Sequence, residues 1–357
     1  MDKHRADEIP ALDGLRALAC ILVVLSHLPE YFTQGGGWLA TGLPLGQVGV
    51  ALFFGLSGFL MTHLYVGSSF TLSRVLNYLI ARFSRIAPAY WLTIVLCFLL
   101  FRFVDPEFVF RIDEHNLLRH LLFLGSEGVF WSIPPEIQYY LFFLLFWGAW
   151  QQWLQGRKML LILLTLACVG LMASREAWPG ILLPSKLHFF LSGTLAAMLF
   201  HRLRQRLTLS CWLLAGLQCL MVLVLTVSVL SLHGMSEQTF YGHSGFYLLV
   251  ALALLVLSFP SRIMDFMLGN RLLGWFGKVS FSVYLLHCPV IYLFNRFCLS
   301  LGWQGAVYDG LALLLALLLP GLFSQWVELP LCNLAKRRGQ QWTKGWLARR
   351  AQTAVAL

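Results

Sequence analysis

Long apolar segments dominate this sequence, and they restrict the chain to a membrane-spanning helical fold. Apolar runs follow one another with mostly short polar connections, and runs of this kind are typical of transmembrane helices. Only 12% of the 357 residues are charged and 59% are hydrophobic, whereas soluble domains carry about 25% charged residues. We predict an all-α, polytopic membrane helix bundle of about ten transmembrane helices. The expected spans are 11–29, 46–66, 86–104, 136–153, 159–174, 185–200, 211–232, 245–259, 279–297 and 306–327.

The positive charges lie mainly in alternate loops and predict the orientation of the chain. An even number of spans places both termini on the same side of the membrane. With both termini in the cytoplasm, 19 of the 26 lysines and arginines fall in cytoplasmic segments, in agreement with the positive-inside rule. The net charge of +10 is thus divided among loops rather than gathered on one soluble face, so we expect no nucleic-acid partner.

The chain contains no internal repeat and no long polar linker. We predict one transmembrane domain over residues 1–335 and a basic cytoplasmic tail over residues 336–357, which contacts anionic lipid. Residues 105–135 form the longest outer loop, in which NLLRHLLFL could be a short interfacial helix. Asp13 and Arg16 interrupt the first apolar run, so we expect a retained helix rather than a signal peptide. The eight cysteines are scattered without a C-x-x-C pair, which predicts buried thiols with neither disulfides nor a metal site.

The first apolar run carries a polar stripe. Eleven residues separate Arg16 from His27, and on a helix this spacing returns the side chain to within roughly 20° of the same face, about 16 Å along the axis. Asp13 lies near the same face. Ionisable residues inside membrane spans are costly and are candidates for function. The alternative for Arg16 is a structural ion pair with Asp13, three residues earlier.

Two arginines lie three residues apart in the stretch ARFSRIAPAYW. Arg82 and Arg85 project from the same side of a helix, and their planar donor groups could hold a phosphate or diphosphate. The alternative interpretation is that both residues anchor the cytoplasmic end of the third span.

A carboxylate follows two prolines in the stretch FWSIPPEIQYYL. Pro134 and Pro135 suit the start of a helix, and Glu136 then occupies the first turn, where the helix dipole favours negative charge. Glu136 could orient His27 or bind a sugar hydroxyl, or it could serve only the helix terminus.

Four further residues are candidates for substrate binding. Trp131 and Tyr140 could stack on a sugar or belong to an interfacial aromatic belt. Ser57 could line a site, or it could allow close helix packing with the glycines around it. His287, near the middle of the ninth span, is either catalytic or a satisfied packing residue.

Taken together, five stretches resemble the acyltransferase-3 family of integral membrane O-acyltransferases, which modify surface carbohydrates. Arg16 and His27 match the R-x10-H pattern of the family, and Arg82 and Arg85 match its R-x-x-R pattern. The matching stretches, in the order that the family uses, are LDGLRALACILVVLSH, GVALFFGLSGFL, ARFSRIAPAYW, FWSIPPEIQYYL and SFSVYLLHCPV.

The resemblance implies acyl-CoA, usually acetyl-CoA, as a cytoplasmic co-substrate, with no permanently bound cofactor. It implies transfer to a hydroxyl of an extracytoplasmic carbohydrate such as O-antigen or exopolysaccharide, from a multi-pass protein of the bacterial inner membrane. The sequence departs from the family where Ile137 follows Glu136, since relatives usually carry adjacent glutamates there. The chain also ends soon after the tenth span, so we expect no extracytoplasmic hydrolase-like domain. The oligomeric state is not predicted.

The resemblance and the spacing together assign roles. His27 would be the base that removes the proton of the acceptor hydroxyl. Arg16 would bind the phosphate part of the donor or stabilise developing negative charge, and Arg82 with Arg85 would hold the CoA phosphates. Transfer could be direct or could pass through an acyl-histidine. The alternatives are a transporter or flippase of a lipid-linked sugar or acyl donor, and a non-catalytic membrane scaffold.

Overall fold

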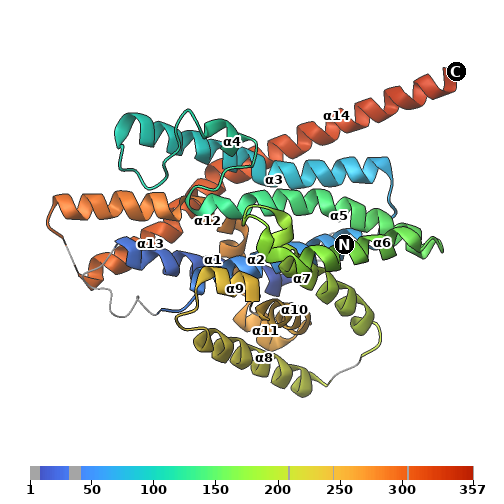
Figure 1. Cartoon of the computed structure of the whole chain (residues 1–357), viewed down its shortest axis with the longest axis horizontal. Helices are drawn as coiled ribbons and strands as arrows, with labels where there is room; N and C mark the ends of the chain where they lie inside the picture. The colour runs from blue at the N-terminus through green and yellow to red at the C-terminus, as the bar shows by residue number, and fades with distance from the viewer. Residues whose placement is uncertain (1–8, 32–41, 208–209, 244, 304, 357) are drawn as a thin grey trace.

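The computed structural model describes residues 9–31, 42–207, 210–243, 245–303 and 305–356 (Figure 1). All regular secondary structure in these ranges is helical, with no strand among them. The helices are α1 (Pro10–Tyr31), α2 (Leu45–Tyr65), α3 (Leu72–Leu99), η2 (Leu100–Val104), α4 (Leu117–Leu121), η3 (Gly128–Ser132), α5 (Ile133–Leu154), α6 (Met159–Ala173), η4 (Arg175–Ala177), α7 (Leu183–Arg204), α8 (Cys211–Ser231), α9 (Glu237–His243), α10 (Phe246–Leu257), α11 (Arg262–Met267), α12 (Arg271–Ser300), α13 (Ala306–Phe323), η5 (Ser324–Glu328) and α14 (Leu329–Ala356).

Each expected apolar span coincides with a helix, which confirms the all-α fold. Within the described ranges, six helical stretches are long and apolar enough to cross a membrane. They are Pro10–Leu28, Leu45–Tyr65, Leu72–Val104, Cys211–Ser231, Arg271–Ser300 and Ala306–Arg350. Helices α6 and α10 are apolar but shorter. The chain is thus a multi-pass membrane protein, while the count of ten spans and the cytoplasmic termini stay predictions.

The centre of the bundle is built from helices that approach one another at glycines. Helix α1 packs against α2 and α12, and α2 packs along α7. A Cβ atom at Gly193 would lie 1.8 Å from the Gly55 carbonyl oxygen, and one at Gly58 would lie 1.9 Å from that of Phe190. Small residues of this kind let backbones approach closely inside a membrane. Gly58 of the second span therefore packs against α7 and Gly49 packs against α1, as one of the two interpretations of that stretch expected.

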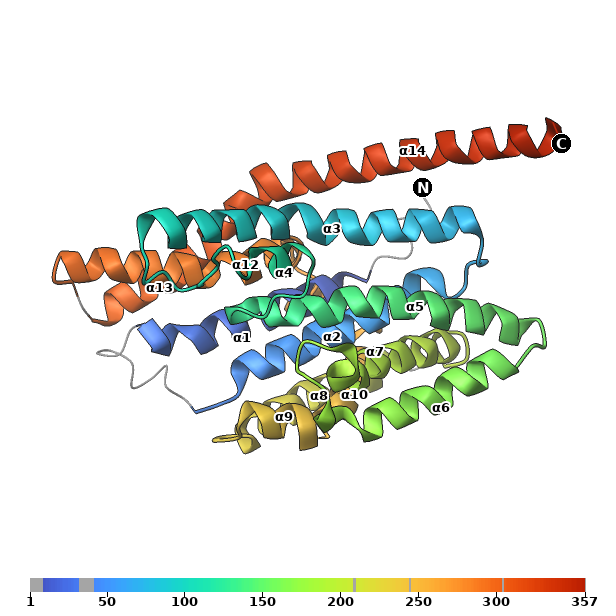
Figure 2. The same ribbon diagram turned by 45° about the horizontal axis from the view of Figure 1, so that its top comes forward.

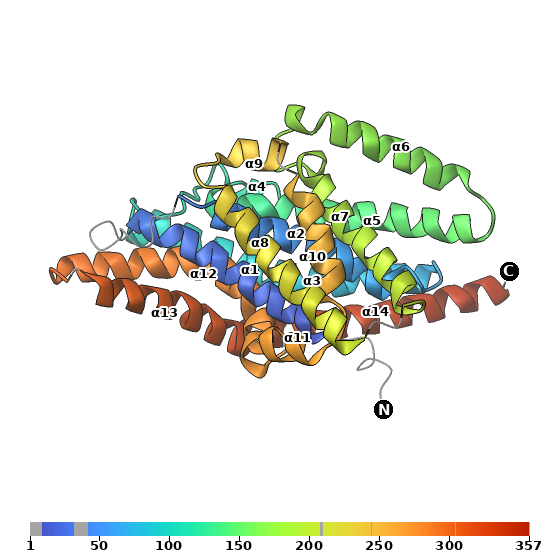
Figure 3. The same ribbon diagram turned by 90° about the horizontal axis from the view of Figure 1, so that it is seen from below.

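The peripheral helices are arranged around this centre. Figure 3 shows α12 and α13 side by side at one edge of the bundle and α6 towards the opposite edge. Helix α8 exposes Cys211 and Cys219, so the expectation that all cysteines are buried is wrong for these two. Their helix lies on the outside of the bundle (Figure 1), with only Gln218 and Met221 buried along it.

The basic tail is helical rather than a separate coil. Helix α14 runs beside α3 and continues past the end of that helix (Figure 2). The close approach of Gly339 to Ile80 supports this packing. At the start of α14, the buried carboxylate of Glu328 accepts hydrogen bonds from Ser282 and Ser324. This carboxylate therefore links α12 to the turn that joins α13 and α14.

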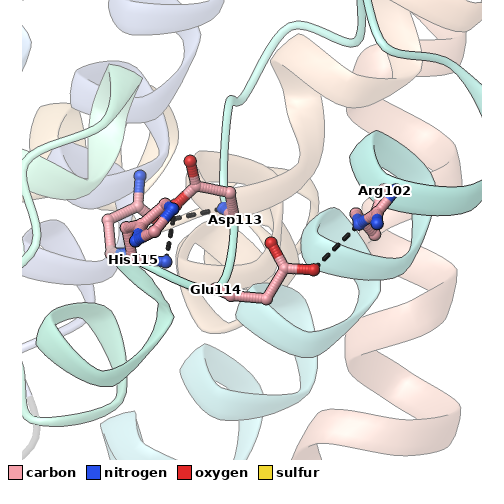
Figure 4. A network of polar contacts seen from close by, with 5 residues as sticks. Arg102, Asp113, Glu114 and His115 are labelled. Carbon is pink, nitrogen blue, oxygen red and sulfur yellow. Dashed lines mark hydrogen bonds and ion pairs between the residues drawn. The ribbon is translucent and has the colours of Figure 1, made fainter.

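The segment between α3 and α5 is held in place by ionic contacts, and it includes the short helix α4 that the pattern NLLRHLLFL predicted. Arg102 donates to Glu114 at 2.8 Å, and the Asp113 carboxylate accepts from the backbone amide of His115 at 2.9 Å (Figure 4). The Arg102 guanidinium holds the pKa of Glu114 below its usual value, chiefly through this hydrogen bond.

A second set of contacts attaches the beginning of this segment to α12. The Tyr292 hydroxyl donates to Asp105 at 2.7 Å, and Arg296 lies 3.7 Å from the same carboxylate. Arg296 also donates to Glu107 at 3.2 Å. The hydrogen bond from Tyr292, followed by that from the Glu107 amide, lowers the pKa of Asp105.

The lowered pKa of Asp105 predicts how this attachment responds to pH. A carboxyl group whose pKa is depressed by folding stabilises the folded state above its unfolded pKa of about 4, and this contribution is lost as the pH falls through the folded value. We expect Asp105→Asn to lower the thermal unfolding midpoint of the purified protein at pH 7, and the difference from wild type to shrink below about pH 4. A constant difference across the pH range would contradict the ionic attachment.

The close approach at Gly193 predicts a strong effect of a single methyl group. We expect Gly193→Ala to destabilise the protein by about 1–3 kcal/mol or more, because the added Cβ would force α7 away from α2. Gly170→Ala is the matched control, since no atom lies within 4 Å of a Cβ at that position. Equal thermal midpoints for the two variants would show that α2 and α7 are not in backbone contact.

Candidate active site

Two histidine rings from different helices meet inside the bundle. His27 of α1 and His287 of α12 lie edge to face, with ring centroids 5.0 Å apart. The Nδ1 atom of His27 lies 3.3 Å from the Nε2 atom of His287. His287 is fully buried. The packing of α1 against α12 therefore brings together two residues that are 260 positions apart in sequence.

The backbone carbonyls around the pair assign the protons on both rings. The Nδ1 atom of His287 lies 2.9 Å from the Tyr284 carbonyl and 3.1 Å from that of Val283, so this nitrogen carries the proton and Nε2 is an acceptor. The Nδ1 atom of His27 faces two acceptors, the Val23 carbonyl at 2.9 Å and His287 Nε2. It must donate, which leaves Nε2 of His27 unprotonated in the neutral ring. A neutral imidazole with a free nitrogen is what a general base requires.

A cavity of about 290 Å³ lies against His27, and we call it the histidine cavity. Aromatic, carboxylate and amide side chains line it together with the histidine, so it combines apolar surface with polar groups. Its lining residues are Val23, Ser26, His27, Leu43, Gly46, Gln47, Val50, Gly128, Val129, Trp131, Glu237, Tyr241 and Tyr284.

A second, narrower cavity of about 50 Å³ adjoins the first, and we call it the arginine cavity. Two of its lining residues, Val50 and Tyr284, also line the histidine cavity. Its complete lining is Arg16, Val50, Phe53, Phe54, Ser57, Arg85, Ile86, Ser132, Ile133, Glu136, Ser280, Phe281 and Tyr284. Arg16 and His27, at the two ends of the predicted polar stripe on α1, therefore line two different cavities that share two wall residues.

The carboxylate of Glu136 lies in the arginine cavity and away from the histidine pair. Its Oε1 atom accepts hydrogen bonds from Ser57 at 2.8 Å and from Tyr140 at 2.7 Å. Three of the predicted site residues thus form one hydrogen-bonded group. Pro134 and Pro135 lie in the first turn of α5, as predicted, and Ile137, where the family resemblance implied a second glutamate, is buried.

His27 has partners other than the carboxylates that the sequence put forward. In the described part of the chain, its ring contacts Val23, Ser26 and His287, and it forms no ion pair or hydrogen bond with Glu136 or Asp13. Glu30 also follows His27 in α1, but its side chain lies outside the described residues. The second histidine therefore holds the position that we expected a carboxylate to hold.

The arginines divide between two environments. Arg16 lies 3.7 Å from Asp13, as the structural alternative expected, yet it also lines the arginine cavity. Arg85 lines the same cavity, and within the described ranges its guanidinium has neither a hydrogen bond nor an ion pair. Arg82 is buried beside Tyr65, to whose hydroxyl it donates at 3.4 Å. The cation that shares the cavity with Arg85 is therefore Arg16 rather than Arg82.

Some residues of the site were not assigned from the sequence. Tyr284 lines both cavities and donates to the Val129 carbonyl at 2.8 Å. It precedes His287 by three residues, so helical spacing could have placed both on one face of α12. Trp131, a candidate for stacking on a sugar, lines the histidine cavity, whereas Glu237 was missed because it begins the short helix α9, whose sequence has no recognisable motif.

His27, His287 and Cys288 offer three donor atoms that lie within 4.8 Å of one another. Both histidines, however, use their Nδ1 atoms in hydrogen bonds to backbone carbonyls. The cluster therefore fits a hydrogen-bonded pair more directly than a cation site.

Comparison with known proteins gives one family over most of the chain. A family model described as an acyltransferase domain matches residues 9–325. The peptidoglycan O-acetyltransferase OatA of Listeria monocytogenes is 26% identical over 80% of this chain and 50% of its own length. The O-acetyltransferase OatA of Staphylococcus aureus strain NCTC 8325 is 24% identical over 93% of this chain and 60% of its own length. The chain thus spans only about half to three fifths of these relatives. No solved structure matches it.

The hydrogen bonds of the histidine pair predict a specific tautomer. In protein with 15N-labelled histidine, we expect the neutral form of the His27 ring to carry its proton on Nδ1, because two acceptors face that nitrogen. Nitrogen chemical shifts report the tautomer, and the missing signals in His27→Gln assign the ring. A His27 ring protonated at Nε2 alone would contradict the arrangement.

Proposed function

The chain belongs to the acyltransferase-3 family, and from this premise we propose that it is a membrane-bound O-acyltransferase. It moves an acyl group, in the first place acetyl, from cytoplasmic acyl-CoA to a hydroxyl of an extracytoplasmic carbohydrate. The observation that carries this proposal is that a cavity lined by arginines and a cavity lined by His27 share Val50 and Tyr284 in their walls. One cavity has the cations that a phosphorylated donor needs, and the other has the base that an alcohol needs.

The proposed orientation gives each cavity its own side of the membrane. Ten spans with both termini in the cytoplasm direct the Arg16 end of α1 inward and the His27 end outward. The arginine cavity then receives the donor, and the histidine cavity receives a glycan at the outer face of the bacterial inner membrane. The two relatives are named for O-acetylation, one of them of peptidoglycan. A cell-surface glycan is thus the acceptor class, with O-antigen and exopolysaccharide as further members.

The donor would be held by the arginines of the inner cavity. Among the described residues, the Arg85 guanidinium has no hydrogen-bond or ion-pair partner, and Arg16 lines the same cavity. Guanidinium groups bind phosphate oxygens through paired, charge-assisted hydrogen bonds. The distance between Arg16 and His27 along α1 assigns Arg16 to the phosphates rather than to the reacting carbonyl. Arg82 would support the arginine cluster from outside the cavity lining, through its hydrogen bond to the Tyr65 hydroxyl.

His27 would carry the proton during transfer. Its free Nε2 removes the proton of the acceptor hydroxyl as that oxygen attacks the thioester carbonyl. When the tetrahedral intermediate collapses, the carbon–sulfur bond breaks and the imidazolium returns the proton to the CoA sulfur, giving ester and free CoA. His287 accepts from Nδ1 of His27 and so fixes the ring orientation, much as the third residue of a hydrolase triad does.

The role of His27 is tested with purified protein in lipid vesicles, acetyl-CoA and an extracted surface glycan. We expect His27→Ala to lower the rate of acetyl transfer at least about a hundredfold, because general base catalysis contributes 10²–10⁴. His115→Ala is the control, since that side chain is exposed in the segment between α3 and α5. Unchanged transfer in His27→Ala would refute the proposal, and glycan movement without consumption of acetyl-CoA would instead support a flippase.

The donor assignment predicts a selective effect on affinity. We expect Arg85→Lys to raise the apparent KM for acetyl-CoA about tenfold without changing the KM for the glycan, because lysine cannot form the paired contact. Arg157→Lys, at an exposed position after α5, should change neither value. A change in the glycan KM alone would place the donor elsewhere.

A further inference from the structure

A third cavity lies beside the histidine cavity. It has a volume of about 410 Å³ and lies among η4, the first turn of α7 and α9. Glu237 and Tyr241 line both it and the histidine cavity. Ligand sites in proteins commonly measure about 300–1,000 Å³, so the combined space suits more than one sugar unit. We call this third space the lysine cavity, after Lys186 in its lining.

Lys186 is the unusual feature of the lysine cavity. Its side chain is only 6% exposed, and its ammonium lies 4.0 Å from the Tyr241 ring centroid and 5.4 Å from that of Trp131. Within the ranges that the structure describes, it has no hydrogen-bond acceptor and no ion-pair partner. Cation–π contacts offset only part of the cost of removing an ammonium from water. The ammonium is therefore available to donate a hydrogen bond to a ligand in the cavity.

No other charged group in the described lining of this cavity forms a hydrogen bond or a close ion pair with the Lys186 ammonium. Arg175 is occupied, since it donates to the carbonyls of Gly242 and Met172 and lies 3.9 Å from Glu176. Glu237 attracts Lys186 electrostatically but does not form an ion pair with it at 4 Å or less. A ligand carboxylate oxygen could accept a hydrogen bond from Lys186, whereas a doubly charged phosphate would be repelled more strongly by the two glutamates.

The aromatic residues indicate what carries this charge. Trp178 lines the lysine cavity, Trp131 lines the histidine cavity, and Tyr241 stands between them. Flat aromatic faces beside hydrogen-bonding side chains suit sugar rings. Building on the proposed function, we propose that the lysine cavity is an acceptor subsite for a sugar that bears a carboxylate, held by Lys186 while the adjoining sugar presents its hydroxyl to His27.

The subsite is tested with the full chain in lipid nanodiscs and two forms of one probe. The probe is the disaccharide of N-acetylglucosamine and N-acetylmuramic acid, either with its free lactyl carboxylate or with that carboxyl reduced to an alcohol. We expect wild-type protein to bind the acid at least about tenfold more tightly, as a hydrogen bond to a charged group requires. Lys186→Met should abolish this preference. Lys158→Met, which removes a lysine 5.4 Å from the Trp153 ring at the protein surface, should retain it.

The outcomes separate the two proposals. Equal affinity of wild type for both forms, failure to bind either, or equal weakening of both by Lys186→Met would overturn the carboxylate subsite. Acetyl transfer from acetyl-CoA to the same two probes is measured separately. Preferential binding of the acid without transfer to any glycan would support the subsite and refute the acyltransferase proposal. Acetyl transfer without any preference for the acid form would support the acyltransferase proposal and refute the carboxylate subsite.

Discussion

A hydrogen bond between two histidine rings on different helices is the interaction on which the arrangement of this site depends. The ring of His27 can meet that of His287 only if α1 and α12 lie in nearly direct contact. Gly277 makes this possible, because a Cβ there would lie 2.1 Å from the Asp13 carbonyl oxygen. Polar groups inside a membrane must find partners within the protein. The backbone contact and the ring contact therefore support each other, and loss of either would expose the other to apolar surroundings.

The parts of the site that follow from local spacing could be predicted from the sequence. The eleven-residue interval between Arg16 and His27 fixes them on one helical face, and Pro134 with Pro135 places Glu136 at the start of α5. The neighbour of His27 could not be predicted, because it depends on how α12 is rotated against α1. The same limit applies to Arg82 and Arg85, whose separation by about 60° around α3 suffices to direct one to Tyr65 and the other into the cavity.

The fold also has some features that could be predicted from the sequence and others that could not. Apolar runs identify helices because their composition reflects burial or contact with lipid, and every expected run is helical. Composition does not record which face of a helix is covered, so the exposure of Cys211 and Cys219 on α8 was not expected. The sequences of the polar loops predict even less about the contacts that these loops form. The anchoring of the segment between α3 and α5 depends on Tyr292 and Arg296, almost two hundred residues away from Asp105.

The narrow arginine cavity also matters for the proton gradient across the membrane. A protein in which a donor from one compartment reacts with an acceptor in the other must not let protons flow down their gradient through the shared passage. Fixed positive charges beside a constriction raise the electrostatic barrier to small cations, as arginine does in selective water channels. In the proposed acyltransferase, the positive charges of Arg16 and Arg85 in this cavity would therefore raise the barrier to hydronium.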